Sequence, residues 1–297
     1  MRSATGGVGS QASVGILLMC AGIASLSISD AIAKALTSSY TPVQILFMRN
    51  LIALPFAVLI ALKMGGTGAL RSYRPAAHLL RGVLWLIAAG LFFTSLKHLD
   101  IAEATALVFV APVFITAISA LFLKETVGWR RWLAVLAGFA GVLIIVRPGA
   151  GTFQNASLLP IVVAFFYAVL MISARWVDPR ESVWTLMLYL VGAGALLSAL
   201  VAPFVWVDIQ AKDMGLFIGI AIFGTAGITL ITQAFRFAPA ATLAPFEYSA
   251  LLWATLLGWL VWQEIPDVLT YVGAVFIILS GCYIVLREQR LAKDGPG

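Results

Sequence analysis

Ten apolar runs, separated by charged, Pro-rich or Gly-rich stretches, dominate this sequence. They cover residues 14–36, 43–63, 76–97, 101–123, 129–146, 156–176, 182–205, 214–236, 240–262 and 267–286. Most are close to the length of about 20 residues that a helix needs to cross about 30 Å of hydrocarbon. The runs are apolar on nearly every face, whereas strands of a membrane barrel alternate apolar and polar residues. The sequence therefore predicts an all-α integral membrane protein with ten transmembrane helices.

The composition excludes a typical water-soluble protein. Hydrophobic residues make up 62% of the chain and charged residues 11%, against about 45–50% and about 25% in soluble domains. A net charge of +6 would suit a nucleic-acid partner, but Lys and Arg lie mainly in short loops, where they orient a membrane protein. We therefore expect a lipid bilayer as surroundings and no nucleic acid as partner.

An internal repeat divides the chain into two halves. Residues 121–125, Leu-Phe-Leu-Lys-Glu, resemble residues 260–264, Leu-Val-Trp-Gln-Glu, and the offset from Glu125 to Glu264 is 139 residues. The same offset places Lys97 on Arg236. Each half holds five runs, and because five is odd, the second half must enter the membrane from the opposite side. We expect two inverted five-helix repeats, residues 14–147 and residues 156–287.

The distribution of Lys and Arg gives the expected orientation. Fourteen of these residues fall in segments on the side of the N-terminus, and Arg49 lies within a run. The opposite side holds only Lys34, Lys97, Arg147 and Lys212. Positively charged loops remain in the cytoplasm. Both termini are therefore expected there, with the protein in the cell membrane, or in the inner membrane if the source is bacterial.

Several short motifs occur in a particular order along the duplicated chain. They are Phe47-Met48-Arg49, Ala111-Pro112, the acids Glu125 and Glu264, and the run ends Arg147-Pro148 and Arg287. Their order over residues 14–287 resembles the drug/metabolite transporter superfamily, specifically its EamA-type members. The resemblance implies a secondary transporter that moves a small organic metabolite by alternating access. It also implies a central cavity lined mostly by the first, third, fourth, sixth, eighth and ninth runs.

The resemblance narrows the substrate only partly. Residues 29–34, Ser-Asp-Ala-Ile-Ala-Lys, look like the end of the first helix in members that take up S-adenosylmethionine or riboflavin. The alternative is an exporter of amino acids, metabolites or drugs from the same superfamily. No cofactor is expected, and homodimerisation is left open.

Glu247 is the most deeply placed acid, seven residues into the ninth run. An ionisable group in hydrocarbon costs at least about 2.5–3.5 kcal/mol, so it needs a partner or a wet cavity. We predict that Glu247 binds a cationic substrate group or carries a proton; the alternative is a structural contact with a neighbouring helix. Aromatic rings that can stack on a planar substrate, or simply pack, complete the predicted substrate site: Phe246, Tyr248, Trp253, Trp85, Phe109 and Tyr167.

Four charged residues are expected towards the outer side. Asp30 and Lys34 share one helical face and can neutralise each other, while Arg49 and Glu103 lie near the outer ends of their runs. Together these four residues predict an external gate that works by exchange of ion pairs, or else a static network that fixes helix packing. Glu264, like Glu125, is expected to hold the turn beside it.

Enzymatic chemistry is not predicted. His78 and His98 have no Cys, His or carboxylate arrangement around them that would bind a metal. No G-x-x-x-x-G-K-[ST] phosphate loop is present, and no nucleophile, base and metal-ligand set converges at one depth. Transport is therefore expected to draw on gradients, exchange or downhill flow.

Overall fold

The computed structural model describes residues 6–121, 129–147, 154–178, 180–238 and 240–294. These residues form helices and connecting loops, without a β-strand, which confirms the predicted all-α class. The helices are α1 (Gly6–Thr37), α2 (Pro42–Gly65), α3 (Pro75–Ser95), α4 (Ile101–Val108), α5 (Ala111–Leu121), α6 (Trp129–Val146), α7 (Leu158–Ile172), α8 (Val183–Val201), α9 (Met214–Phe237), α10 (Ala240–Glu247), α11 (Ser249–Trp262) and α12 (Val268–Asp294). Short 3-10 segments are η1 (Thr67–Leu70), η2 (Asn155–Ser157), η3 (Ser173–Trp176), η4 (Ala202–Val205) and η5 (Ala211–Asp213).

Seven helical stretches in the described residues are long and apolar enough to cross a membrane. They are Ser13–Thr37, Pro42–Gly65, Pro75–Ser95, Ile101–Leu121, Asn155–Ile172, Val183–Val205 and Ala211–Phe237. Two shorter apolar stretches, Trp132–Val146 and Val268–Ile284, belong to α6 and α12. The protein is therefore a multi-pass membrane protein.

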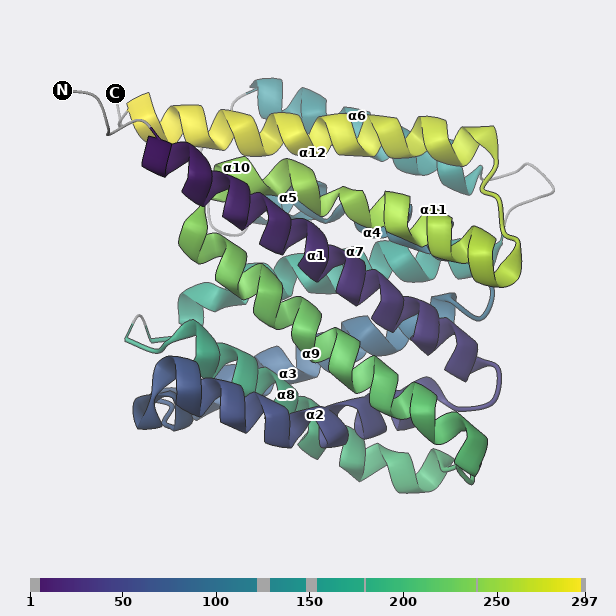
Figure 1. Ribbon diagram of the computed structural model, residues 1–297. Helices are drawn as coiled ribbons and strands as arrows, with labels where there is room; N and C mark the ends of the chain where they lie inside the picture. Colours follow the sequence, from purple (N-terminus) through teal and green to yellow (C-terminus); the bar gives the residue numbers. More distant parts are fainter. Residues whose placement is uncertain (1–5, 122–128, 148–153, 179, 239, 295–297) are drawn as a thin grey trace.

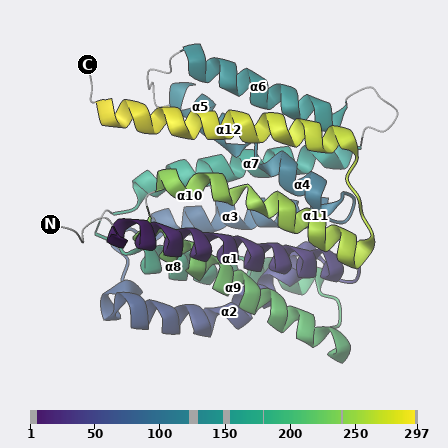
Figure 2. The same ribbon diagram turned by 45° about the horizontal axis from the view of Figure 1, so that its top comes forward.

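The helices lie roughly side by side in one bundle (Figures 1 and 2). The most extensive pairings join α1 with α9, α6 with α12, α2 with α8, and α3 with α7. The α6–α12 pair forms one edge of the bundle and the α2–α8 pair the opposite edge (Figure 1). The start of α1 and the end of α12 lie at the same end of the bundle. Every main pairing joins a helix from each half of the chain, so neither half packs as a separate domain.

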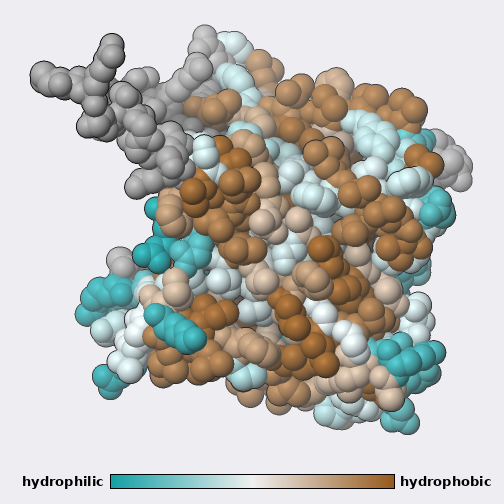
Figure 3. Space-filling view, in the orientation of Figure 1, coloured by the Kyte–Doolittle hydropathy of each residue, from teal (hydrophilic) through white to brown (hydrophobic). Residues whose placement is uncertain are grey.

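The surface has the polarity expected of a membrane-spanning bundle. Apolar side chains cover the middle of the face in Figure 3, and hydrophilic side chains gather at its two ends. Leu17, Leu252 and Phe204 are 70%, 73% and 86% exposed. Such exposure of large apolar groups would be costly in water but is favourable against lipid tails. The long axes of the helices therefore follow the membrane normal.

Local sequence explains where several helices begin and how closely they pack. Thr41 caps α2 by accepting a hydrogen bond from the Gln44 N–H, and Pro42 supplies a residue without an N–H at the first helical position. At the α6–α12 crossing, a Cβ atom on Gly141 would lie 2.7 Å from the carbonyl oxygen of Gly273. Only glycine permits this approach.

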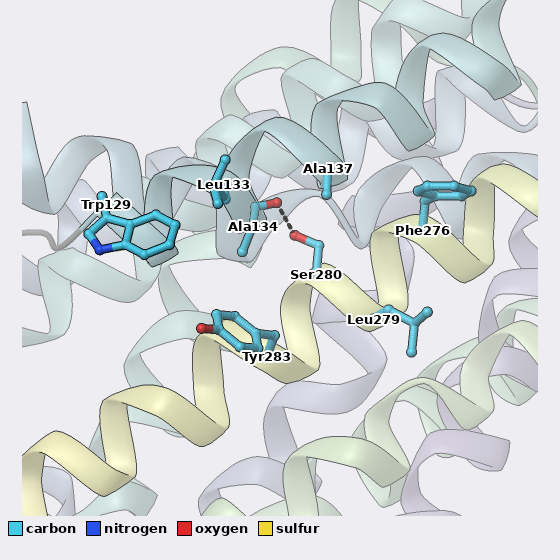
Figure 4. Close-up of a pocket in the computed structure, with 8 residues that line it drawn as sticks. All are labelled: Trp129, Leu133, Ala134, Ala137, Phe276, Leu279, Ser280 and Tyr283. Carbon is cyan, nitrogen blue, oxygen red and sulfur yellow. Dashed lines mark hydrogen bonds between the residues drawn. The ribbon is translucent and has the colours of Figure 1, made fainter.

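The edge pair α6–α12 also bounds a groove of about 530 Å³ (Figure 4). Its lining residues are Trp129, Leu133, Ala134, Ala137, Phe276, Leu279, Ser280 and Tyr283. The Ser280 hydroxyl donates its hydrogen bond to the Ala134 carbonyl at 2.5 Å. The lining of this groove is thus mostly apolar.

Candidate functional site

Two helices are interrupted within the bundle. The sequence pattern predicted continuous helices over residues 101–123 and 240–262, but the first breaks at Phe109–Val110 and the second at Tyr248. Pro112 has no N–H for the Val108 carbonyl and its ring crowds that turn, which explains the first break. Pro245 likewise removes a donor from α10, three residues before the second. Residues 101–121 nevertheless form one of the stretches long and apolar enough to cross a membrane, as the predicted span requires.

The two interruptions meet. Phe109 and Tyr248 pack edge to face with ring centroids 5.0 Å apart, and the 139 residues between them equal the offset of the sequence repeat. A Cβ atom on Gly281 would lie 2.0 Å from the Tyr248 hydroxyl oxygen. Because Gly281 has no side chain, the phenol of Tyr248 can lie against the backbone of α12.

Glu247 ends α10 immediately before the second break and is exposed. Its carboxyl group is close enough to the hydroxyl groups of Tyr167 and Tyr248 to interact with both electrostatically. Tyr167 comes from α7 and is 36% exposed. An acid of α10 and a phenol of α7 thus interact near the second helix break. Such a place can hold a cationic or hydrogen-bonding solute.

The other predicted aromatic residues lie elsewhere. Phe246 and Trp253 pack against an apolar cluster of α1, α9 and α10 that includes Met19 and Leu243. Trp85 lines a separate cavity between α2, α3, α8 and α9. Of the seven predicted substrate residues, the structure therefore brings together Glu247, Tyr248, Phe109 and Tyr167.

The predicted charged gate divides between two places. The Lys34 ammonium bonds both carboxylate oxygens of Glu264, at 2.5 and 2.7 Å, and the Leu99 carbonyl at 2.9 Å. It therefore pairs with Glu264 rather than with Asp30 on its own helix. Glu103 accepts a hydrogen bond of 3.1 Å from Ser157 at the same end of the bundle. Glu264 thus does hold the turn after α11, while Glu125 lies outside the described residues.

Asp30 and Arg49 lie deeper and interact electrostatically with each other. Arg49 is buried, and it lines the cavity that also contains Trp85. Its neighbour Asn50, which the sequence-based site omitted, is buried in the same wall. A second polar residue directly after Arg49 in an apolar run was the signal that could have identified it.

A polar pocket of about 240 Å³ lies beside Glu103. Arg147 and Asp267 form an ion pair in its wall. The hydrogen bond from Arg147 holds the pKa of the Asp267 carboxyl below its ordinary value. Asp267 also accepts a hydrogen bond of 2.8 Å from the Thr270 N–H at the start of α12. The sequence-based site lacked this pair, although the Asp-x-x-Thr pattern before the tenth run was a capping signal.

A second polar network ties the opposite end of the bundle. Glu181 accepts hydrogen bonds from the Ser72 hydroxyl and from the N–H groups of Tyr73 and Arg74, at 2.9, 2.6 and 3.2 Å. Its other oxygen lies 2.5 Å from His78 Nε2. His78 thus has a structural partner. Within the described residues, no group of three or more His, Cys, Asp and Glu side chains could hold a metal ion.

The sequence matches a family model described as the EamA-like transporter family, over residues 13–147 and again over 154–287. An S-adenosylmethionine uptake transporter of Rickettsia bellii is 27% identical over 94% of this chain and 95% of its own. A riboflavin transporter of Vibrio cholerae is 32% identical over 77% of this chain and 78% of its own. A pseudopaline exporter of Pseudomonas aeruginosa is 26% identical over 93% and 97%.

The fold is also similar to a known crystal structure. That chain superposes with a TM-score of 0.63 and is 20% identical in sequence, with 94% of this chain and 98% of the other covered. At this identity the similarity describes the arrangement of helices and carries no information on substrate.

Proposed function

The chain belongs to the EamA-like transporter family, and we propose that it moves a small organic metabolite by alternating access through a site at its two interrupted helices. The observation that carries this proposal is the meeting of Phe109 and Tyr248, with Glu247 and Tyr167 beside them. Interrupted helices provide free backbone groups and helix ends for binding in other membrane transporters. Membership of this family supports transport rather than catalysis as the activity.

We further propose ten membrane crossings in two inverted repeats. The α10–α11 pair would form one crossing, and α6 and α12, each extending beyond its apolar stretch, would supply two more beside the seven long stretches. The start of α1 and the end of α12 lie at the same end of the bundle, which fits an even number of crossings. The family model matches two segments of similar length, and each segment would hold five of the proposed crossings, which supports the inversion.

The charge distribution favours both termini in the cytoplasm, and in bacteria the inner membrane as the location. Cysteine labelling tests this orientation in a variant lacking Cys20 and Cys282. Ser38→Cys, in the α1–α2 loop, should react with an impermeant maleimide in intact cells. Arg71→Cys, in the loop before α3, should react only after permeabilisation; both are exposed. The reverse pattern would invert the assignment.

Among the candidate cargoes, the acidic site favours a cationic metabolite such as S-adenosylmethionine over neutral riboflavin. The ionised form of a carboxylate is stabilised by a positive charge on its ligand. Uptake is the first candidate direction, because the S-adenosylmethionine relatives are named uptake transporters. Export stays the alternative, since a relative of similar identity is named an exporter.

Transport of labelled S-adenosylmethionine and riboflavin into proteoliposomes tests the function. The native protein should move S-adenosylmethionine, and Glu247→Gln should reduce the rate by about tenfold or more, equivalent to about 1.4 kcal/mol. Asp208→Asn, an exposed acid in a loop, is the matched control and should transport normally. An unchanged rate in Glu247→Gln would refute the role of Glu247. Movement of riboflavin alone would refute the preference for a cation.

A further inference from the structure

Arg49 and Asn50 place two hydrogen-bonding side chains in the interior of the bundle. They are 8% and 4% exposed. Each lies against a glycine of a neighbouring helix: a Cβ atom on Gly224 of α9 would lie 2.8 Å from Arg49 Nη2, and one on Gly194 of α8 would lie 2.7 Å from Asn50 Nδ2. The two glycines thus make room for these polar groups.

These side chains lack hydrogen-bond acceptors. Within the described part of the chain, Asn50 Nδ2 is buried without a partner, and the Arg49 guanidinium donates no hydrogen bond. Asp30 interacts with Arg49 through its charge but forms no direct ion pair with it among the described residues. A guanidinium presents five N–H donors in a planar fork, and leaving buried donors unpaired is costly. The Asn50 amide and the Arg49 guanidinium can therefore donate hydrogen bonds to an acceptor that enters this place.

Both side chains line one enclosed cavity of about 30 Å³, together with Trp85 of α3 and Thr225 of α9. A cavity needs about 10–15 Å³ to hold a water molecule, so this one accommodates a group of a few atoms. It is too small for a whole metabolite. The remaining lining residues are mostly apolar, which leaves the guanidinium and the amide as its principal donors.

We propose that this cavity binds the carboxylate group of the transported metabolite. A carboxylate matches the fork of an arginine with two parallel hydrogen bonds, and it also accepts from the Asn50 amide. The inference rests on the proposed function and narrows its substrate class to metabolites with a carboxylate. It agrees with S-adenosylmethionine, which carries a carboxylate, and disagrees with riboflavin, which has none.

Binding of acetate to the purified full-length protein in detergent tests the cavity directly. Acetate should raise the thermal unfolding midpoint in a saturable way, whereas acetamide and chloride at matched ionic strength should not. Arg49→Lys, which keeps the charge but loses the fork, should weaken acetate binding by about tenfold or more. Gly224→Ala should weaken it as well, because the new methyl group displaces the guanidinium.

Two further variants separate binding from general instability. Arg81 is equally buried, but it donates hydrogen bonds to the Leu170 carbonyl and to Ser173, at 2.8 and 3.0 Å. Arg81→Lys should therefore lower the midpoint without changing the affinity for acetate. Asp30→Asn removes a charge that competes for Arg49 and should strengthen acetate binding several-fold.

Three results would overturn the proposal: equal stabilisation by chloride or acetamide, no saturable response to acetate in the native protein, or equal weakening in the Arg49 and Arg81 variants. The assay needs no transport. Saturable, Arg49-dependent binding in a protein that moves no tested solute would contradict the proposed cargo and leave the carboxylate site standing. Transport of a solute by a protein that shows no response to acetate would contradict the carboxylate site and leave the proposed transport function standing.

Discussion

Tyr248 depends on the absence of a side chain at position 281. Its hydroxyl oxygen occupies the space where a Cβ atom of Gly281 would be, and its ring contacts Phe109. Gly281→Ala should therefore push Tyr248 out of this position and lower transport by about tenfold. Gly215→Ala is the control, because a Cβ atom on Gly215 would meet nothing within 4 Å. The measurement is the transport rate in proteoliposomes. Equal rates in Gly281→Ala and Gly215→Ala would show that the position of Tyr248 is unimportant for transport.

Single residues were predictable from the sequence where burial in lipid made them costly. Glu247 and Arg49 stood out as charges within apolar runs, and the structure gives both of them polar neighbours. Aromatic residues gave no such signal, because a ring is equally compatible with packing and with binding. Phe246 and Trp253 pack against α1 and α9, for example, whereas Phe109 lies at a helix break.

At the scale of elements, the apolar runs predicted where helices lie but not where they break. The length of an apolar run reflects the thickness of the membrane. A proline inside such a run can lie in a continuous helix or beside an interruption. Pro55 lies within a continuous α2, while Pro112 stands beside the interruption between α4 and α5. The difference depends on whether neighbouring helices satisfy the freed carbonyl groups, which is a tertiary property that a single run does not contain.

The start of α3 depends on Glu181, which lies beyond the end of α7. This carboxylate accepts hydrogen bonds at the N-terminal end of the helix, where negative charge is also favoured by the helix dipole. Glu181→Gln should lower the free energy of unfolding by about 1–2 kcal/mol. Ser72→Ala, which removes one of the donors, should cost less. Thermal unfolding of both variants compares their losses of stability. A larger loss in Ser72→Ala than in Glu181→Gln would contradict this prediction.

The hydrogen bonds of Glu181 also predict that the stability of the protein depends on pH. Burial opposes ionisation of Glu181, but hydrogen bonds from His78, Tyr73, Ser72 and Arg74 outweigh it, and the pKa lies below the ordinary value of 4.5. A lowered native pKa means that the stabilisation is complete above about pH 4.5 and is lost as the pH falls through the native pKa. Stability of the native protein should thus fall more steeply below pH 4.5 than that of Glu181→Gln. Parallel pH profiles would refute this.

In the molecule as a whole, contacts at one end of the bundle join helices from both halves. Lys34 of α1 joins Glu264, after α11, to the Leu99 carbonyl, before α4. Alternating access requires that contacts of this kind break when the protein opens at that end. The network was only partly foreseeable, because the charges are visible in the sequence but their pairing depends on which helix ends become neighbours.

Removing this tie should favour the state open at that end. In a variant without Cys20 and Cys282, a cysteine at Thr105, half-buried on α4 one turn beyond Ile101, reports access to an impermeant maleimide. Lys34→Glu should increase its labelling rate several-fold, and the added Glu264→Lys exchange should restore the low rate. Tyr40→Phe is the control, since the 2.7 Å Tyr40–Asp213 hydrogen bond links the α1–α2 loop to η5, before α9, and does not involve Lys34 or Glu264. If that variant opened the protein equally, or if the double exchange failed to restore closure, the Lys34–Glu264 pair would be a local packing contact rather than part of the gate.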